Sequence, residues 1–223
     1  VVLTDVLMAH GKYKGLRYPY LVNHHWCVDA TIDIVGDQGE RWGAFDVKLL
    51  LPRSYPVGVP TVFEQAARIK ADADWHINED GSCCIGPWVG EMKKYGGRAV
   101  LVDWLDRSVV PFLANHLYKE RLGHYRSGEY SHGIKGILEY YQELWPFELH
   151  EIIRRLRQVV RVDRPVAKEN CFCGSGERYD NCHLLRSEFD GVTRESYKQD
   201  LAYLELYAAS LVQMPNAAPS LVL

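Results

Sequence analysis

Residues Trp75–Trp88 read W-H-I-N-E-D-G-S-C-C-I-G-P-W, which gathers a histidine, an asparagine and two adjacent cysteines around one turn. The pair Asp80-Gly81 predicts a sharp turn, after which the chain runs extended through both cysteines. Successive side chains of an extended segment point to opposite faces. The pattern therefore predicts that one of Cys83 and Cys84 is packed and the other is presented.

A presented cysteine in such a segment is a candidate nucleophile. A thiol nucleophile needs thiolate character, access, and a donor for the oxyanion that forms when a carbonyl is attacked. The side-chain amide of Asn78 is a suitable donor. Structural interpretations stay open for both residues, because free cysteine is commonly a small core residue and Asn78 can simply hydrogen-bond the backbone of the Asp80-Gly81 turn.

The segment upstream, Leu51–Phe63, reads L-P-R-S-Y-P-V-G-V-P-T-V-F. It resembles the Pro…Tyr-Pro-x-x-x-Pro segment of ubiquitin-conjugating enzymes, which leads into a His-Pro-Asn tripeptide and then Gly-x-apolar-Cys. Here His76-Ile77-Asn78 stands for the tripeptide, with isoleucine in place of proline. The run from Asn78 to the cysteine is also shorter than in eukaryotic members. The resemblance covers residues 20–145.

The resemblance implies a fold and a chemistry for this part of the chain. In the family the cysteine lies three residues after the glycine, which selects Cys84 as the nucleophile and puts Cys83 at the apolar position. The implied reaction is acyl transfer through a thioester on Cys84 to a target amine. Asn78 would stabilise the oxyanion, and His76 would hold the loop that carries Asn78 and Cys84.

Alternating segments predict the core sheet. Trp26–Val35 and Trp42–Leu51 alternate in part, and the turn Gly36–Gly39 joins them as a hairpin. Val59–Phe63 makes a third strand. The sequence thus predicts an α+β domain with an antiparallel meander, which is also the sheet implied by the ubiquitin-conjugating resemblance.

Three further segments of the first domain have predicted structures. Residues 1–20 open with a short helix. Lys93–Gly97 is a basic loop, for which a solvated surface and a guide for a partner's tail are both open interpretations. Val100–Lys119 carries apolar residues at helical spacing and predicts a core helix that bends or restarts at Pro111.

Residues Gly128–Gly136 read G-E-Y-S-H-G-I-K-G. Ser131 predicts the cap of a helix whose buried face includes Ile134 and Tyr141. The G-E-x-x-H-G-x-x-G pattern also resembles bacterial relatives of ubiquitin-conjugating enzymes, including those encoded beside cyclic-oligonucleotide synthases in antiphage operons. That resemblance implies that His132 lines the active site as an acid, a base or a shape element, although a histidine at a helix start is often structural.

Residues Asn170–His183 read N-C-F-C-G-S-G-E-R-Y-D-N-C-H. Three thiolates and one imidazole, from Cys171, Cys173, Cys182 and His183, make a closed tetrahedral zinc set. Four protein ligands leave no open position, so the predicted zinc is structural. The segment resembles the SEC-C zinc motif, an accessory module of many bacterial proteins.

The predicted organisation has three parts. Residues 1–145 form a ubiquitin-conjugating-like catalytic domain, 146–169 a linker helix with a cationic face, and 170–223 a SEC-C zinc module with a closing amphipathic helix over 192–212. The cationic face is interpreted as solvated or as a contact for an acidic partner.

Composition limits the functional classes. A net charge of -3 over 223 residues gives no indication of binding to nucleic acid or to an anionic membrane. No apolar run approaches the about 20 residues that span a bilayer, and the start lacks a secretory pattern. Three of the six cysteines fit a metal set rather than a disulfide scaffold, which favours the cytoplasm.

The implied partners are a ubiquitin-like modifier or the C-terminus of a cyclic-nucleotide synthase, an activating enzyme, and a target lysine. Two other functions stay open. The chain could be a non-catalytic module of the same fold that only grips a modifier. It could also be a zinc-dependent adaptor in which Cys83 and Cys84 act as redox thiols.

Overall fold

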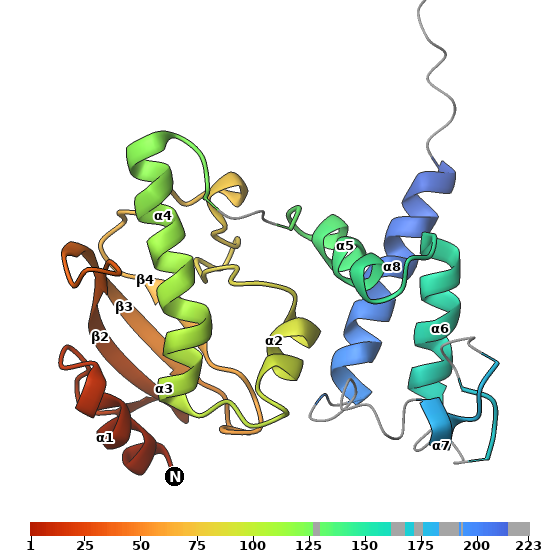
Figure 1. The fold of residues 1–223 in the computed structure, drawn as a ribbon, viewed down its shortest axis with the longest axis horizontal. Coiled ribbons are helices and arrows are strands. Elements are labelled where there is room, and N and C mark those ends of the chain that lie inside the picture. The colour runs from red at the N-terminus through yellow and green to blue at the C-terminus, as the bar shows by residue number, and fades with distance from the viewer. Residues whose placement is uncertain (127–129, 162–167, 172–175, 183–191, 193, 214–223) are drawn as a thin grey trace, which may run out of the picture. The chain divides into compact units, whose positions relative to one another are not determined.

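The protein divides into two units along the chain. The structure, a computed structural model, describes residues 1–126, 130–161, 168–171, 176–182, 192 and 194–213. The first unit runs from Val1 to His132, and the second begins at Gly133 (Figure 1). The division falls before the helix that starts at Ile134, whereas the sequence placed the boundary after that helix, at residue 145.

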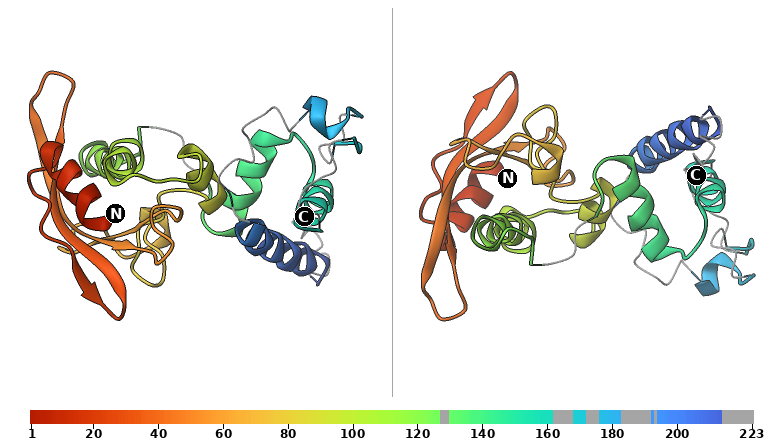
Figure 2. Two further views of the ribbon diagram at one scale, coloured as in Figure 1. Left: turned by 90° about the horizontal axis from the view of Figure 1, so that it is seen from below. Right: turned by 90° about the horizontal axis from the view of Figure 1, so that it is seen from above.

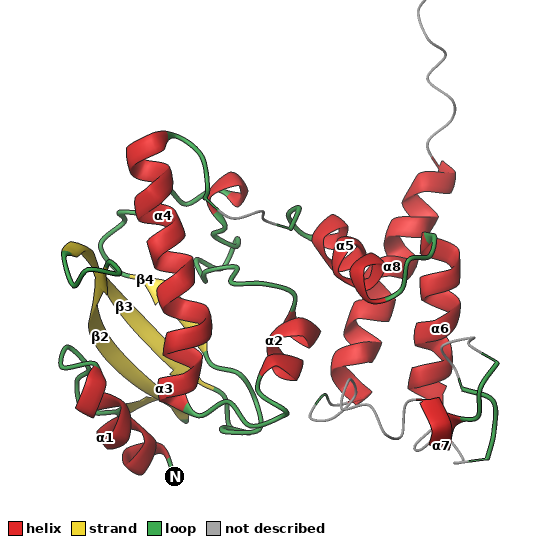
Figure 3. Cartoon of the chain, in the orientation of Figure 1, coloured by secondary structure: helices red, strands yellow, loops and turns green. Residues whose placement is uncertain are grey.

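The first unit is built on a four-stranded antiparallel sheet with strand order β1-β2-β3-β4 (Figure 3, yellow). The strands are β1 (Tyr20–Val22), β2 (His25–Val35), β3 (Arg41–Leu51) and β4 (Thr61–Glu64). The predicted meander is confirmed, because β2, β3 and β4 fall on the three alternating segments. Strand β1 was missed: it is three residues long and exposed throughout, so it carries no alternation.

Helices cover one side of this sheet (Figure 2). They are α1 (Val2–Lys12), α3 (Leu101–Trp104), the π-turn η2 (Leu105–Val109) and α4 (Val110–Leu122). The predicted core helix is confirmed as this α3-η2-α4 run. Pro111 lies in the first turn of α4, directly after the π-turn η2, where its missing N–H interrupts the regular helical hydrogen bonds.

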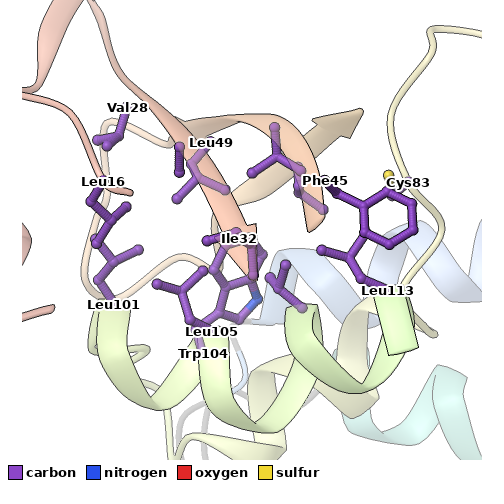
Figure 4. Packing of buried hydrophobic residues seen from close by; sticks show 14 of the residues in the cluster. Leu16, Val28, Ile32, Phe45, Leu49, Cys83, Leu101, Trp104, Leu105 and Leu113 are labelled. Atoms are coloured by element: carbon purple, nitrogen blue, oxygen red, sulfur yellow. The ribbon is translucent and has the colours of Figure 1, made fainter. Parts of the chain in front are cut away.

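Helix and sheet residues share one apolar core, part of which is drawn in Figure 4. Its largest fully buried side chains come from β2, β3, α3, η2 and α4, and include Ile32, Phe45, Leu49, Trp104, Leu105 and Leu113. Cys83 belongs to the same cluster. The segment that carries the two cysteines is therefore anchored in the core of the first unit.

The predicted basic loop is partly helical. Helix α2 spans Trp88–Lys94, and the Lys94 ammonium donates to Glu91 Oε1 at 2.9 Å and to Ser108 Oγ at 3.1 Å. Ser108 in turn donates to the other oxygen of Glu91 and bonds Tyr95. Lys94 is exposed, in keeping with a solvated loop, and its ammonium also belongs to a network that ties α2 to η2.

The second unit contains α5 (Ile134–Leu144), α6 (Leu149–Arg161), the short α7 (Tyr179–Cys182) and α8 (Arg194–Gln213). Helix α6 packs against α8 and α5, so it is part of a bundle rather than a linker. The predicted Ser131 cap is wrong: the N-cap residue of α5 is Gly133, at φ 62°. Within the described ranges, none of the helices is long and apolar enough to cross a bilayer.

Two charged side chains, those of Arg155 and Asp200, are buried in this bundle. Arg155, which the sequence counted on the cationic face of α6, is only 3% exposed. Its Nε donates to Glu151 and its guanidinium lies 4.0 Å from the centre of the Phe147 ring. Asp200 of α8 is also buried and accepts a 2.8 Å hydrogen bond from the hydroxyl of Tyr141 on α5.

Candidate functional site

Cys84 lies in a short two-stranded ribbon formed by residues 76–78 and 82–84. The Cys84 N–H donates to His76 O at 2.7 Å, and the Asn78 N–H donates to Ser82 O at 2.8 Å. Ile77 and Cys83 face each other between these bonds, which is the pattern of an antiparallel pair. The register therefore places His76 opposite Cys84 and Asn78 opposite Ser82.

The turn of the ribbon is the one that the sequence predicted. The Gly81 N–H donates to Asn78 O at 2.9 Å, and Gly81 has a φ of 82°, in the left-handed region that glycine adopts without strain. The ribbon also continues the sheet, since the Cys83 N–H donates to Val62 O of β4 at 2.8 Å. Cys84 is thus held in place relative to a rigid sheet.

The two adjacent thiols differ in exposure, as the alternation predicted. Cys83 is 7% exposed, and burial raises the pKa of its thiol to about 12. Cys84 is half-buried, and burial raises its pKa as well. Both groups are therefore thiols at neutral pH, and only Cys84 has access to a reactant. A reaction at Cys84 requires that its proton be taken up by another group.

Asn78 is exposed and lies in a polar turn. Its Nδ2 donates to Ser82 Oγ at 2.9 Å, and Ser82 Oγ donates to Asp80 Oδ1 at 2.6 Å. These bonds from Ser82 hold the pKa of the Asp80 carboxyl below its usual value. The side chain of Asn78 thus bonds a side chain and not the turn backbone. An amide has two N–H donors, so one bond to Ser82 is compatible with donation to an oxyanion.

His132 lies against His76 although the two are far apart in the sequence. Their ring centres are 4.5 Å apart with an interplanar angle of 60°. His132 Nε2 is 3.8 Å from Asp74 Oδ1, and a third of its side chain is exposed. The structure therefore brings together four residues that the sequence singled out, with His76 and Asn78 in one ribbon strand, Cys84 in the other, and His132 beside His76.

A group of side chains, mainly from α4, packs against these residues. The sequence did not predict this contact. His116 is 1% exposed and packs against Phe112 of the same helix, with ring centres 4.5 Å apart. Burial lowers the pKa of His116 to about 3, with smaller effects from the charges of His76 and Lys119, so its ring is neutral. Tyr125 contacts both His116 and His76 at 5.3 and 5.4 Å between ring centres. The sequence did carry one signal for this contact, a polar residue at position 116 on an otherwise apolar helix face.

Half of the predicted zinc set can be located. Cys171 and Cys182 are both buried, at 5% and 7% exposure. The Cys171 N–H donates to Glu177 O at 2.7 Å across a hairpin. Cys173 and His183 lie outside the described residues, and no group of three metal-ligating side chains occurs within the described part of the chain. The zinc set stays a prediction.

Comparison of the chain with protein-family models, with curated proteins and with solved structures finds no match.

Proposed function

We propose that the first unit is a ubiquitin-conjugating-like cysteine acyltransferase that carries an acyl group as a thioester on Cys84. The observation that carries the proposal is the pairing of Cys84 with His76 in a ribbon fixed to the sheet, with the neighbouring thiol buried. The support is threefold: Cys84 is accessible, Asn78 lies in the same ribbon, and His132 lies beside His76.

The chemistry runs in two steps. In the first, the Cys84 sulfur attacks the carbonyl of an activated acyl group, a new thioester forms, the bond to the leaving group breaks, and the thiol proton passes to a base. In the second, a lysine amine attacks the Cys84 thioester, an amide forms, the C–S bond breaks, and Cys84 recovers its thiol. Each step passes through a tetrahedral oxyanion.

Each neighbour of Cys84 has a proposed role. Asn78 donates an amide hydrogen bond to the oxyanion. His76 holds the ribbon, because its carbonyl accepts the Cys84 N–H. A third of the His132 side chain is exposed, and it acts as an acid, a base or a shape element for the incoming amine.

The proposed partners are those that the resemblances of the sequence imply. The acyl group is the C-terminal carboxyl of a ubiquitin-like modifier or of a cyclic-nucleotide synthase, activated by a separate enzyme, and the acceptor is a lysine of a target protein. We place this reaction in a bacterial antiphage or conjugation operon. In the second unit, a structural zinc would be held by Cys171, Cys173, Cys182 and His183. The zinc would stabilise a small SEC-C-like module that serves as a recognition element.

One observation favours a second candidate, a non-catalytic module of the same fold that only binds a modifier. Burial raises the pKa of the Cys84 thiol and thereby lowers its thiolate fraction. The exposure of Cys84 beside Asn78 and two histidines weighs in favour of catalysis.

A small thioester tests the proposal without its natural partners. The protein is mixed with a glycine-ended peptide thioester whose leaving group is a simple thiol, and the acylated chain is measured by intact mass. We expect one acyl adduct in wild type and in Cys83→Ala, reversed by added thiol, and none in Cys84→Ala. An adduct that depends on Cys83 instead would refute the assignment. No cysteine-dependent adduct in folded wild-type protein would favour the binding module.

A further inference from the structure

Lys119 of α4 contacts the segment that precedes His76. Its ammonium donates to Asp74 O, in the turn η1 (Ala73–Trp75), at 2.6 Å. The same ammonium lies 4.5 Å from the centre of the Trp75 ring and 4.0 Å from that of Tyr125. A cation over two aromatic faces and a carbonyl is attracted by all three.

These contacts act on the residue that pairs with Cys84. The chain passes from Asp74 and Trp75 directly into His76, whose carbonyl accepts the Cys84 N–H. His76 has a φ of 51°, in the left-handed region that a side chain with a Cβ rarely adopts. Such a conformation persists only when its surroundings determine it. On the N-terminal side the His76 N–H donates to Ala73 O at 2.8 Å and Lys119 holds the turn at Asp74 O, while the ribbon holds the C-terminal side.

Trp75 completes the link to the helix. Its ring stacks on that of buried His116, with ring centres 6.2 Å apart and planes at 18°. Helix α4 therefore contacts η1 at two points one helical turn apart, through the neutral ring of His116 and through the charge of Lys119. Since α4 also packs on β2 and β3, these two contacts tie the Cys84 ribbon to the body of the first unit in addition to its bond with β4.

We propose that Lys119 is a positioning residue for the chemistry at Cys84, acting through Asp74, Trp75 and the His76 carbonyl. The inference rests on the proposed acyl transfer for its kinetic consequence, but its structural part concerns only the order of the ribbon. Lys119 touches neither the sulfur nor the acyl group in this scheme. It fixes the backbone on which Cys84, His76 and Asn78 are mounted.

Helix α4 offers a matched control. Arg121 makes the same type of contact two residues further on: its Nη2 donates to Trp42 O at 2.8 Å, and its guanidinium lies 5.8 Å from the Trp42 ring centre. Trp42 belongs to β3, not to the turn before His76. Lys119→Met and Arg121→Met therefore remove equivalent interactions from one helix, and Lys119→Arg restores a cation.

The test measures ribbon order and reactivity in the full chain. Amide hydrogen exchange at Cys84 reports the opening of its bond to His76. Loss of a charge-assisted hydrogen bond should speed this exchange about tenfold in Lys119→Met. Loading from the glycine-ended peptide thioester should slow about tenfold, because the sulfur is less well placed. We expect Arg121→Met to match wild type in both measurements, and Lys119→Arg to recover most of each loss.

The outcomes separate the two proposals. Equal exchange at Cys84 in Lys119→Met and Arg121→Met would overturn the positioning role. So would faster exchange spread evenly over the whole first unit, since that reports general destabilisation. If the wild type forms no acyl adduct, acyl transfer fails, and the exchange measurement alone still decides whether Lys119 orders the ribbon.

Discussion

The substitution Asn78→Ala tests whether Asn78 donates to an oxyanion or only stabilises the turn. If the amide donates to the oxyanion when a lysine amine attacks the thioester, its removal raises the barrier of that step. Loading of Cys84 exchanges one thioester for another and depends less on Asn78, since an activating enzyme also shapes that step. We therefore expect Asn78→Ala to load with an acyl group and to discharge slowly.

The structure allows the two effects of this substitution to be compared in size. The Asn78 side chain is exposed and makes one neutral hydrogen bond, to Ser82 Oγ. Losing such a bond costs about 0.5–1.5 kcal/mol of stability, which lowers the melting temperature by about 3 °C. Removing one oxyanion donor costs about 2.7–4 kcal/mol, a loss of roughly a hundred- to a thousand-fold in rate. A loss of about 1 kcal/mol in stability leaves the protein folded. Lost stability alone therefore cannot produce such a large fall in the discharge rate.

The assay measures single-turnover discharge of the acyl-Cys84 adduct onto free lysine. A melting curve of each protein is recorded beside it. Ser82→Ala is the control, because it breaks the same hydrogen bond from the other side and leaves the Asn78 amide in place. We expect slow discharge in Asn78→Ala alone. Normal discharge in a folded, loaded Asn78→Ala protein would remove Asn78 from the catalytic residues, and equal slowing in Ser82→Ala would assign the effect to the turn.

Two predictions concern the second unit. Structural zinc contributes about 10–16 kcal/mol in small zinc modules, so Cys173→Ser should lose the one bound zinc and unfold the C-terminal region while the first unit stays folded; equal zinc in both proteins by metal analysis would contradict this. Burial raises the pKa of the Asp200 carboxyl to about 6 from 3.8, so the ionised form is penalised in the folded state. Stability of the bundle should therefore be full below pH 4, fall as the pH rises toward 6, and be lower by about 3 kcal/mol above it. Asp200→Asn should remove this dependence from urea unfolding curves taken at pH 5 and 7.5, and identical pH profiles of wild type and variant would show that Asp200 is not its source.

Local patterns were enough to predict the frame of the first unit. The meander follows from alternating apolar residues in β2 and β3, and the ribbon turn follows from Asp80-Gly81. The different burial of Cys83 and Cys84 needed only the period of an extended chain. Each of these features depends on neighbours in sequence, and the structure has each of them.

Features that depend on distant contacts could not be predicted in the same way. The aromatic contacts to His76 and Trp75 come from α4 and from Tyr125, and the local signal in α4, a polar residue at position 116 of an apolar face, does not say which segment it meets. Arg155 was placed on a cationic face, either solvated or in contact with an acidic partner, because charge marks a polar face; its long side chain instead lies along an aromatic ring with its charge paired to Glu151. The partners of Lys94 were not predictable either, since they come from η2 as well as from its own helix.

The raised pKa of Cys84 fits a carrier of acyl groups better than a protease-like nucleophile. A thiol of high pKa is a poor leaving group, so its thioester resists release until the attack is assisted. In the proposed reaction, the same burial that slows loading would keep the acyl group on Cys84. Release would then depend on groups that act only when an amine arrives, with Asn78 of the ribbon donating to the oxyanion and His132, beside His76, serving the amine. Under this proposal, a half-buried cysteine of low thiolate content beside these polar side chains suits a carrier that discharges only to a bound amine.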